Sequence, residues 1–286
     1  MKVIAKERIA ENLTKLVIES PLIAKKALPG QFVVLMAAKV GERVPLTIVD
    51  ADRQKQTITI IFQEVGYTTR LLGTLKPNDS LYSLVGPLGK PTPIKNYGRV
   101  IVLGGGVGIA ELLPLVRALK GAGCTITSIL GGRTAELVIL RDQVKEFSDD
   151  MYITTDDGSL GEKGVVTDPL KRLLDESSDY GLVFCVGPVP MMKAVSEVTR
   201  LFKIKIVVCL NPIMVDGTGM CGCCRVTVGG ETKFTCVDGP DFDGYEVDFD
   251  ELMARQKRFV QHEKQAMCKL DKQINNEASW ERNDDG

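Results

Sequence analysis

The sequence is short of histidine, of net charge and of long apolar runs. Its 36 basic and 37 acidic residues give a net charge of −1, which excludes a broad field that would attract nucleic acid or an anionic membrane. The N-terminus, MKVIAKERIAENLTKLVIES, has neither the apolar core of a signal peptide nor a membrane-spanning segment. We therefore expect a cytoplasmic protein without a nucleic-acid or membrane partner. The one histidine, His262, lies in a polar stretch and is interpreted as a solvated side chain.

Cysteine, in contrast, is present and unevenly distributed. Four cysteines are scattered and four fall within sixteen residues. The scattered ones are Cys124, Cys185, Cys209 and Cys268, and the clustered ones are Cys221, Cys223, Cys224 and Cys236. Because a cytosolic compartment disfavours structural disulfides, the cluster predicts a metal site.

The 286 residues suffice for two domains and a small third, and the apolar pattern changes three times along them. Residues 1–95 contain short alternating runs such as TIVDA, which predict a small antiparallel β-barrel with one short helix in TTRLLGTL. Residues 96–210 alternate apolar strands with helices, one of them in LVILRDQVKEFS, and predict an α/β domain with a doubly wound parallel sheet. Residues 211–250 are rich in Gly, Cys and Asp, with a hairpin expected in CRVTVGGETKFTCV. Residues 251–286 predict a charged helix followed by a tail.

The strongest motif is Asp216-x4-Cys221-x2-Cys224-x11-Cys236. Two closely spaced cysteines in a glycine-rich loop, here MVDGTGMCGCCR, with a further ligand downstream are typical of plant-type [2Fe–2S] sites. The glycines allow the backbone to fold tightly and aim N–H groups at the sulfides. Structural zinc and free thiols are the alternatives. Zinc is disfavoured because structural zinc sites prefer four Cys or His ligands and this segment has no histidine.

A glycine-rich turn follows the strand RVIVL and consists of Gly104, Gly105, Gly106, Val107 and Gly108. Such a turn lets a phosphate approach the N-terminus of the next helix. The turn fails the G-x-G-x-x-G fingerprint because Ile109 stands at the third position, and the second strand runs into Arg133 rather than an acidic residue. The chain is therefore not an ordinary Rossmann dehydrogenase, and a turn required only for helix–sheet packing is the alternative.

A weaker pattern, Arg43-Val44-Pro45-Leu46-Thr47, opens a barrel strand. An arginine and a hydroxyl at this spacing can hold a diphosphate and the edge of a flavin ring. An exposed arginine before a proline-bounded strand explains the pattern equally well.

Together these motifs resemble the ferredoxin reductase superfamily. Arg43 to Thr47 resembles its flavin-binding motif, Gly104 to Gly108 its nicotinamide-domain turn, and Gly187-Pro188-Val189-Pro190-Met191 its G-P-x-x-M motif. With the cysteine spacing added, the chain resembles the electron-transfer subunit of dihydroorotate dehydrogenase. GPLGKP, TDDGSLGEKGVVTD, VGPVPMMKAV and PIMVDGTGMCGCCRVTVGGETKFTCVDGPDFD resemble still more closely the small subunit of NADH-dependent ferredoxin:NADP oxidoreductase, also described as the sulfide dehydrogenase small subunit.

The resemblance implies FAD, one [2Fe–2S] cluster and NAD(H) as substrate, with no catalytic residue beyond these cofactors. It assigns Arg43, Pro45, Leu46, Thr47, Gly66, Thr68 and Thr69 to the flavin. It assigns Gly104, Gly105, Gly106, Val107, Gly108, Arg133, Asp156, Asp157, Gly187, Pro188 and Met191 to the nicotinamide nucleotide. It assigns Asp216, Cys221, Cys224 and Cys236 to the cluster, with Cys223 as the challenger to Asp216 for the fourth ligand.

Two positions depart from the superfamily pattern. Val186 precedes Gly187 where cysteine is frequent, and Cys185 lies one residue earlier. Because neighbouring residues of a strand point to opposite faces, we expect Cys185 in the core. Glu111 stands where relatives usually carry proline, and we interpret it as a carboxylate favoured by the dipole of the helix N-terminus.

The resemblance also implies a heterodimer. Its large subunit is a flavoprotein similar to the glutamate synthase small subunit, with [4Fe–4S] clusters and an NADP(H) site, and the complex bifurcates electrons from NADPH to ferredoxin and NAD⁺. The loop 216–224 and the helix after Glu251 are the candidate docking surface. The alternatives are an electron-transfer subunit of dihydroorotate dehydrogenase or of a sulfide dehydrogenase or sulfur reductase, and, in a different class, a redox sensor or zinc module.

Overall fold

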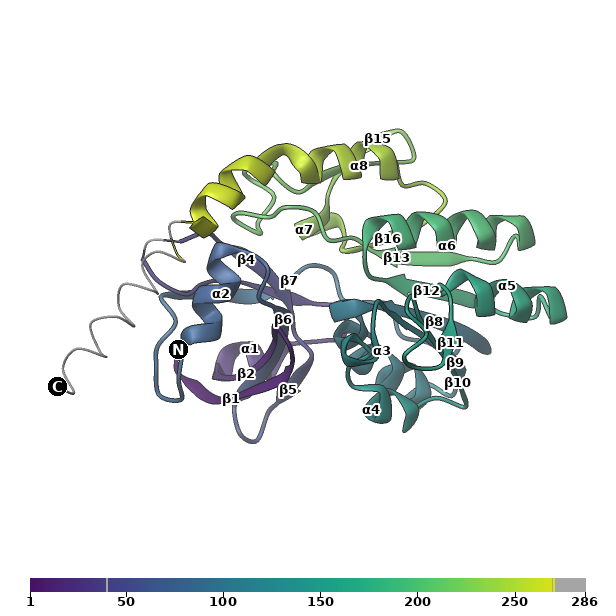
Figure 1. Cartoon of the computed structure of the whole chain (residues 1–286), viewed down its shortest axis with the longest axis horizontal. Coiled ribbons are helices and arrows are strands. Elements are labelled where there is room, and N and C mark those ends of the chain that lie inside the picture. The colour runs from purple at the N-terminus through teal and green to yellow at the C-terminus, as the bar shows by residue number, and fades with distance from the viewer. Residues whose placement is uncertain (40, 269, 271–286) are drawn as a thin grey trace.

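A computed structural model describes residues 1–39, 41–268 and 270 (Figure 1). The N-terminal part is the expected antiparallel barrel, built from two sheets. One sheet has the order β1-β2-β6-β5 and the other β4-β3-β7. The strands are β1 Val3–Ala10, β2 Leu13–Glu19, β3 Phe32–Met36, β4 Val44–Thr47, β5 Asp50–Asp52, β6 Thr57–Gln63 and β7 Ser83–Leu88. Their inward residues, including Leu16, Ile18, Ile58 and Ile60, are fully buried in one apolar core.

The barrel departs from the sequence expectations in two places. The run TIVDA was expected as one strand, but β4 ends at Thr47 and β5 begins at Asp50 in the other sheet. Ile48 and Val49 are buried where the chain crosses between the sheets. The short helix α1 (Pro21–Lys26) was not expected; it starts at a proline and inserts Ile23 and Ala24 into the barrel core. The helix expected in TTRLLGTL is present as α2 (Tyr67–Thr74).

The central part is the expected doubly wound sheet, with the order β11-β10-β9-β8-β12-β13-β16. Its strands are β8 Arg99–Gly105, β9 Thr125–Gly132, β10 Asp150–Thr155, β11 Glu162–Lys163, β12 Leu182–Val186, β13 Ile206–Cys209 and β16 Asp241–Asp243. All pairs are parallel except β13 with β16. The last strand comes from the cysteine-rich segment, so this segment extends the sheet of the α/β part.

Helices cover both faces of this sheet, as alternation along β8 requires. Val100 and Val102 pack with α3 (Ile109–Gly121) and α4 (Arg141–Lys145). Ile101 and Leu103 pack with α5 (Thr167–Glu176) and α6 (Val189–Phe202) on the other face. The helix expected in LVILRDQVKEFS is only partly correct. Val138 and Ile139 are buried in irregular backbone between the short 3₁₀ turn η2 (Ala135–Leu137) and α4, so tertiary burial overrides helix propensity there.

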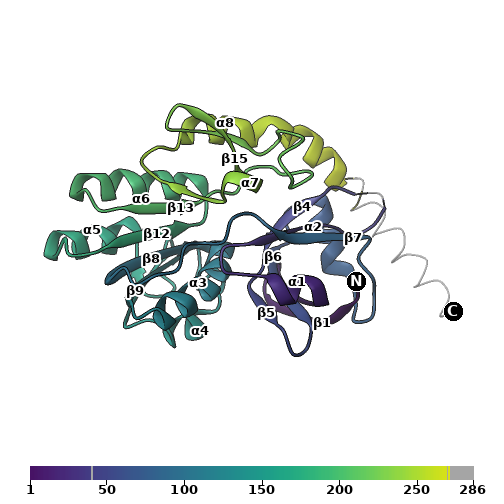
Figure 2. The same ribbon diagram turned by 180° about the vertical axis from the view of Figure 1, so that it is seen from behind.

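The C-terminal part lies across the other two (Figures 1 and 2). It contains the expected hairpin, β14 Arg225–Val228 and β15 Glu231–Phe234, followed by α7 Thr235–Asp238, α8 Phe249–Gln256 and the 3₁₀ turn η3 Lys257–Phe259. Phe249 and Leu252 of α8 join the core beneath α6. Cys224 and Cys236 join a small core with Phe32 and Val34 of β3. The cysteine-rich segment is therefore packed against both the barrel and the α/β part.

Residues 260–268 continue as helix, whereas the expected tail NNEASWERNDDG lies outside the described residues. Within the described ranges, no helix is both long and apolar enough to cross a membrane.

Candidate functional site

A cavity of about 530 Å³ lies at the carboxyl ends of the parallel strands, where the α/β part meets the barrel. The ends of β8 and β9 at Gly105 and Gly131 and the turn after β12 at Gly187 form one side, and Leu13 and Gln63 contribute from the barrel. Open α/β sheets bind ligands at this edge. The predicted nucleotide residues that line it are Gly105, Gly106, Val107, Gly108, Arg133, Asp156, Gly187, Pro188 and Met191.

The glycine turn brings backbone close to this cavity. Gly106 has φ 56°, a conformation that favours glycine, and the short 3₁₀ turn η1 (Gly106–Gly108) leads directly into α3. A Cβ atom on Gly108 would lie 2.9 Å from the carbonyl oxygen of Val186 and 3.0 Å from Cα of Gly187. The turn at Gly108, after β8, is thus in backbone contact with the turn at Gly187, after β12. Their glycine surface and the helix N-terminus fit the phosphates of a dinucleotide.

Gly104 and Asp157 differ from the other predicted nucleotide residues, because neither lines the cavity. A Cβ atom on Gly104 would lie 2.6 Å from Leu112 Cδ1, so this glycine serves helix–sheet packing. The Asp157 carboxylate accepts hydrogen bonds from the backbone N–H and the hydroxyl of Ser159, at 2.9 and 2.6 Å. Both assignments stay predictions.

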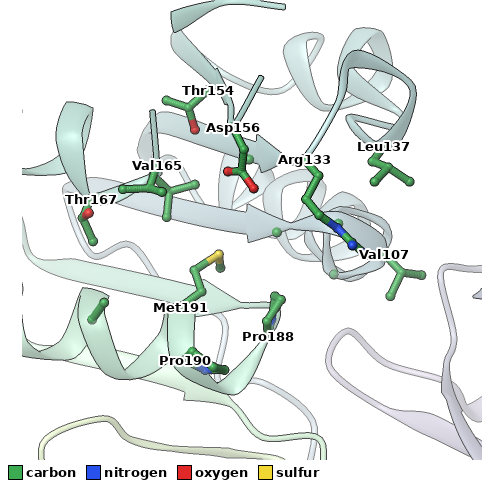
Figure 3. A pocket seen from close by; sticks show the side chains of 18 of the residues that line it. Val107, Arg133, Leu137, Thr154, Asp156, Val165, Thr167, Pro188, Pro190 and Met191 are labelled. Atoms are coloured by element: carbon green, nitrogen blue, oxygen red, sulfur yellow. The ribbon is translucent and has the colours of Figure 1, made fainter. Parts of the chain in front are cut away.

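Arg133 and Asp156 follow the ends of β9 and β10 and project into the cavity (Figure 3). Met191 of α6 faces them from the opposite wall (Figure 3). An acidic and a basic side chain therefore line the same cavity. Cys185, by comparison, is fully buried in the core, as expected, and burial raises its pKa.

The predicted flavin residues lie on the barrel, outside the lining of this cavity. Arg43 is exposed just before β4. The Thr68 hydroxyl hydrogen-bonds the backbone N–H and carbonyl of Glu42, at 3.1 and 3.2 Å, which holds the Arg43 loop against the start of α2. Thr69 accepts from the Gly66 N–H at 2.9 Å. The two segments assigned to the flavin diphosphate are thus neighbours in space.

Glu111 lines the cavity and meets a buried polar cluster that sequence reasoning missed. Cys209 donates to Glu111 Oε2 over 3.6 Å, and Thr92 donates to Asp241 Oδ2 over 2.5 Å. Burial raises the pKa of Glu111 to about 7, although Cys209 and Thr47 favour its ionised form. Burial likewise raises the pKa of Asp241 to about 6. The dipole interpretation of Glu111 is therefore incomplete, because desolvation outweighs any stabilisation of its charge.

The cysteine-rich loop forms the second site. Gly217, Gly219 and Gly222 all have positive φ, at 77°, 86° and 66°. These conformations let the loop turn tightly and direct its backbone N–H groups inward. The sulfurs of Cys224 and Cys236 lie 3.2 Å apart, and both side chains are buried. Burial and the neighbouring Cys224 thiol raise the pKa of Cys236 to about 12. A cationic iron–sulfur core would supply the positive charge that thiolates at this position lack.

Asp216 and Cys221, two of the predicted cluster ligands, both belong to this loop. The Asp216 carboxylate accepts from the N–H groups of Thr218 and Cys221 at 2.7 and 2.8 Å, and these donors lower its pKa. Partial burial raises the pKa of Cys221, but backbone N–H groups at Cys223 and Asp216 outweigh it and lower the pKa overall. Both groups therefore favour the anionic forms that bind metal.

The Cys223 thiol lies beside the Cys221 thiol, whose proximity adds to the effect of burial on its pKa. The Cys223 carbonyl accepts a hydrogen bond from Arg255 of α8 at 3.2 Å, and its thiol is half-buried with a raised pKa. Cys221 is exposed, and among the described residues no three His, Cys, Asp or Glu side chains converge as a metal ion requires. The donor types fit a [2Fe–2S] cluster, while gathering four donors requires movement of loop 216–221. The ligand set stays a prediction.

Comparison with known proteins also identifies an iron–sulfur domain in the cysteine-rich segment. Residues 211–248 match the iron–sulfur cluster binding domain of dihydroorotate dehydrogenase B. The chain is 48% identical over 263 residues to a dihydroorotate dehydrogenase B (NAD⁺) electron transfer subunit homolog of Thermotoga maritima, covering 92% of this chain and 93% of that one. It is 33% identical to the electron transfer subunit of Geobacillus thermodenitrificans, covering 86% of this chain and 97% of the relative.

Solved structures agree. A chain in the structure of an NADH-dependent reduced ferredoxin–NADP oxidoreductase, described in relation to flavin-based electron bifurcation, superimposes with a TM-score of 0.88 and 47% identity, covering 94% of this chain and 97% of that one. Phthalate dioxygenase reductase, at 17% identity and a TM-score of 0.58 over 79% of this chain and 85% of that one, shares the fold.

Proposed function

The chain belongs to the family of dihydroorotate dehydrogenase B electron transfer subunits and their homologues, and from this membership we propose how its sites divide the work of an oxidoreductase subunit. The subunit uses FAD, a [2Fe–2S] cluster and NAD(H), and it transfers electrons within an NADH-dependent ferredoxin:NADP oxidoreductase of the bifurcating type. FAD supplies the conversion between hydride transfer and single-electron transfer. The observation that carries the proposal is the packing of the cysteine loop on barrel strand β3, beside the cavity-forming domain.

Each site has a binding role in this proposal. The turn Gly105–Gly108 and the N-terminus of α3 hold the nucleotide phosphates, and Pro188 and Met191 form the wall that orients the nicotinamide. Arg43 and Thr47, with the start of α2 at Gly66, Thr68 and Thr69, hold FAD. Asp216, Cys221, Cys224 and Cys236 hold the cluster. A visible spectrum tests the assignment: flavin bands with a long-wavelength cluster shoulder support it, whereas a colourless protein contradicts it and favours a zinc module.

The name of the Geobacillus relative favours a second candidate, electron transfer to a dihydroorotate dehydrogenase partner. In either case the relatives are subunits, so this chain works with a larger partner. We propose that the partner is a flavoprotein similar to the glutamate synthase small subunit, with [4Fe–4S] clusters. Mass spectrometry of the co-purifying chain distinguishes the two candidates.

We expect NADH to be preferred over NADPH. The Asp156 carboxylate in the cavity can accept a ribose hydroxyl and repels a 2′-phosphate, whereas Arg133 beside it attracts one. Asp156→Asn should therefore reduce the preference for NADH over NADPH. Arg133→Ala should lower activity with NADPH more than with NADH. Diaphorase assays at equal concentrations of the two nucleotides measure this. Faster turnover of the unmodified protein with NADPH would count against the assignment.

The partner is expected to dock over the cysteine loop. Met220 in this loop is 89% exposed, and a groove beside Cys221 and Cys223 carries Arg225 and Arg258, which suits an acidic partner face. Met220→Glu should weaken association about 10-fold or more while the cofactor spectra persist.

The matched control is Leu201→Glu, which changes an equally apolar, 76% exposed residue of α6. Equal loss of co-purification in both variants would show that the effect is not local to the loop. A deletion from residue 251 is less informative, because Leu252 is fully buried and Arg255 bonds the cysteine loop.

A further inference from the structure

The polar cluster beside the cavity joins three parts of the chain. Glu111 is in the first turn of α3, Cys209 ends β13, and Asp241 begins β16. Thr47 of the barrel lies beside Glu111, and Thr92 of the connecting segment bonds Asp241. We call Glu111, Cys209 and Asp241 the acid–thiol cluster. Glu111 is the member of this cluster that lines the cavity, so protons exchange between the cluster and the cavity through the Glu111 carboxylate.

Counting protons shows that this cluster has room for one more. The Cys209 thiol has a single proton and lies beside both carboxyl groups, 3.6 Å from Glu111 Oε2, so it can donate to only one of them at a time. Thr92 satisfies Asp241 Oδ2, but within the described part of the chain the buried Asp241 Oδ1 has no hydrogen-bond donor. We infer that the two carboxyl groups share one additional proton. When Asp241 Oδ1 carries this proton, the oxygen becomes a donor and can hydrogen-bond the Cys209 sulfur.

Cys209 interacts with both carboxyl groups, so the three groups form one electrostatic unit. Glu111 and Asp241 each raise the pKa of Cys209, and the field of Asp241 contributes to the raised pKa of Glu111. The other ionisable groups around Glu111 sit apart from this unit. Arg133 and Asp156 line the same cavity, while on α3 itself Arg117 pairs with Asp50 and Lys120 with Asp149.

The redox reaction leaves a proton that needs an acceptor. Oxidation of NADH to NAD⁺ releases two electrons and one proton, and a one-electron acceptor such as an iron–sulfur cluster takes the electrons alone. Resting on the function proposed above, we propose that the acid–thiol cluster is a proton store: the Glu111 carboxylate takes this proton when electrons leave singly and returns it when NAD⁺ is reduced. Cys209 and Asp241 are positioning residues that hold Glu111 and share the proton.

The raised pKa values fit such a store near neutrality. Glu111 shifts from 4.5 to about 7, so the folded protein binds more protons than the unfolded chain between these values. Stability contributed by Glu111 is therefore present at low pH and is lost as the pH rises from about 4.5 through 7. Thermal unfolding should show this fall, and Glu111→Gln should flatten it.

The direct test compares Glu111→Gln with Glu146→Gln, an exposed glutamate of the same domain, in the full chain with its cofactors. Flavin and cluster spectra are recorded first, so that failure of the proposed function is recognised separately. Infrared difference spectra should show a protonated carboxyl band that disappears as the pH rises through about 7. The band should be absent in Glu111→Gln and present in Glu146→Gln. A band that persists in Glu111→Gln would overturn the proposal.

Kinetics provide the second arm. With a one-electron acceptor, Glu111→Gln should lower kcat on the order of 10²-fold, leave the KM for NADH unchanged and remove the pH dependence near neutrality. Cys209→Ser retains a donor and should preserve the wild-type pH profile, whereas Cys209→Ala should shift it. A wild-type kcat and pH profile in Glu111→Gln would overturn the proposal. Indistinguishable pH profiles for the two Cys209 variants would also overturn it.

Discussion

Gly108→Ala is expected to slow NADH oxidation on the order of 100-fold while leaving the iron–sulfur cluster in place. The added Cβ would lie 2.9 Å from the Val186 carbonyl oxygen and 3.0 Å from Gly187 Cα, which are backbone atoms that cannot rotate away. The two turns that flank the proposed nicotinamide position must separate, and an error of about 1 Å in reactant placement costs about this much in rate. Single-turnover reduction by NADH measures the effect.

Gly121→Ala is the matched control. Gly121 ends the same helix, and a Cβ there meets nothing within 4 Å. This variant should keep the wild-type rate. A Gly108→Ala protein that is reduced as fast as the control would show that the turn does not position the nucleotide.

Asp216→Ala is expected to weaken or abolish the [2Fe–2S] cluster. Asp216 is held ionised by two backbone N–H groups and carries the same charge as a thiolate ligand, so Asp216→Cys should retain a cluster with an altered spectrum. Cys223→Ser should change little, because its sulfur is adjacent in sequence to that of the buried Cys224, and both could reach one cluster only through a distorted loop. EPR and iron content measure all three variants.

The opposite pattern would reassign the fourth ligand. If Cys223→Ser loses the cluster and Asp216→Ala keeps an unaltered signal, Asp216 is not a ligand. Cys268→Ser, at an exposed cysteine remote in sequence from the loop, serves as the control for general effects of removing a thiol.

The barrel and the doubly wound sheet follow from sequence because their strands are continuous apolar or alternating runs. Ile101 and Val102 of β8, for example, belong to opposite cores, as the strand period requires. Short elements are less predictable. Helix α1 has only six residues, and Val138 and Ile139 leave helical geometry because the core accepts them as irregular backbone.

The candidate site is predictable where a motif concentrates its residues and not where distant residues meet. The glycine turn and the end of β9 at Arg133 both reach the cavity, as their positions after apolar strands suggest. The contact of Glu111 with Cys209 joins residues 98 positions apart, and Asp241 reaches them only because β16 adds to the sheet edge. The one available signal was an acidic residue, Glu111, shortly after the glycine turn.

Anaerobic addition of NADH to the purified full chain tests whether electrons pass from the nucleotide cavity to the cysteine loop. Optical and EPR spectra are recorded on the same sample. We expect the flavin bands to bleach and the signal of a reduced [2Fe–2S] cluster to develop. A flavin that bleaches while the cluster stays oxidised, or a protein without either cofactor, would contradict this path of electron transfer.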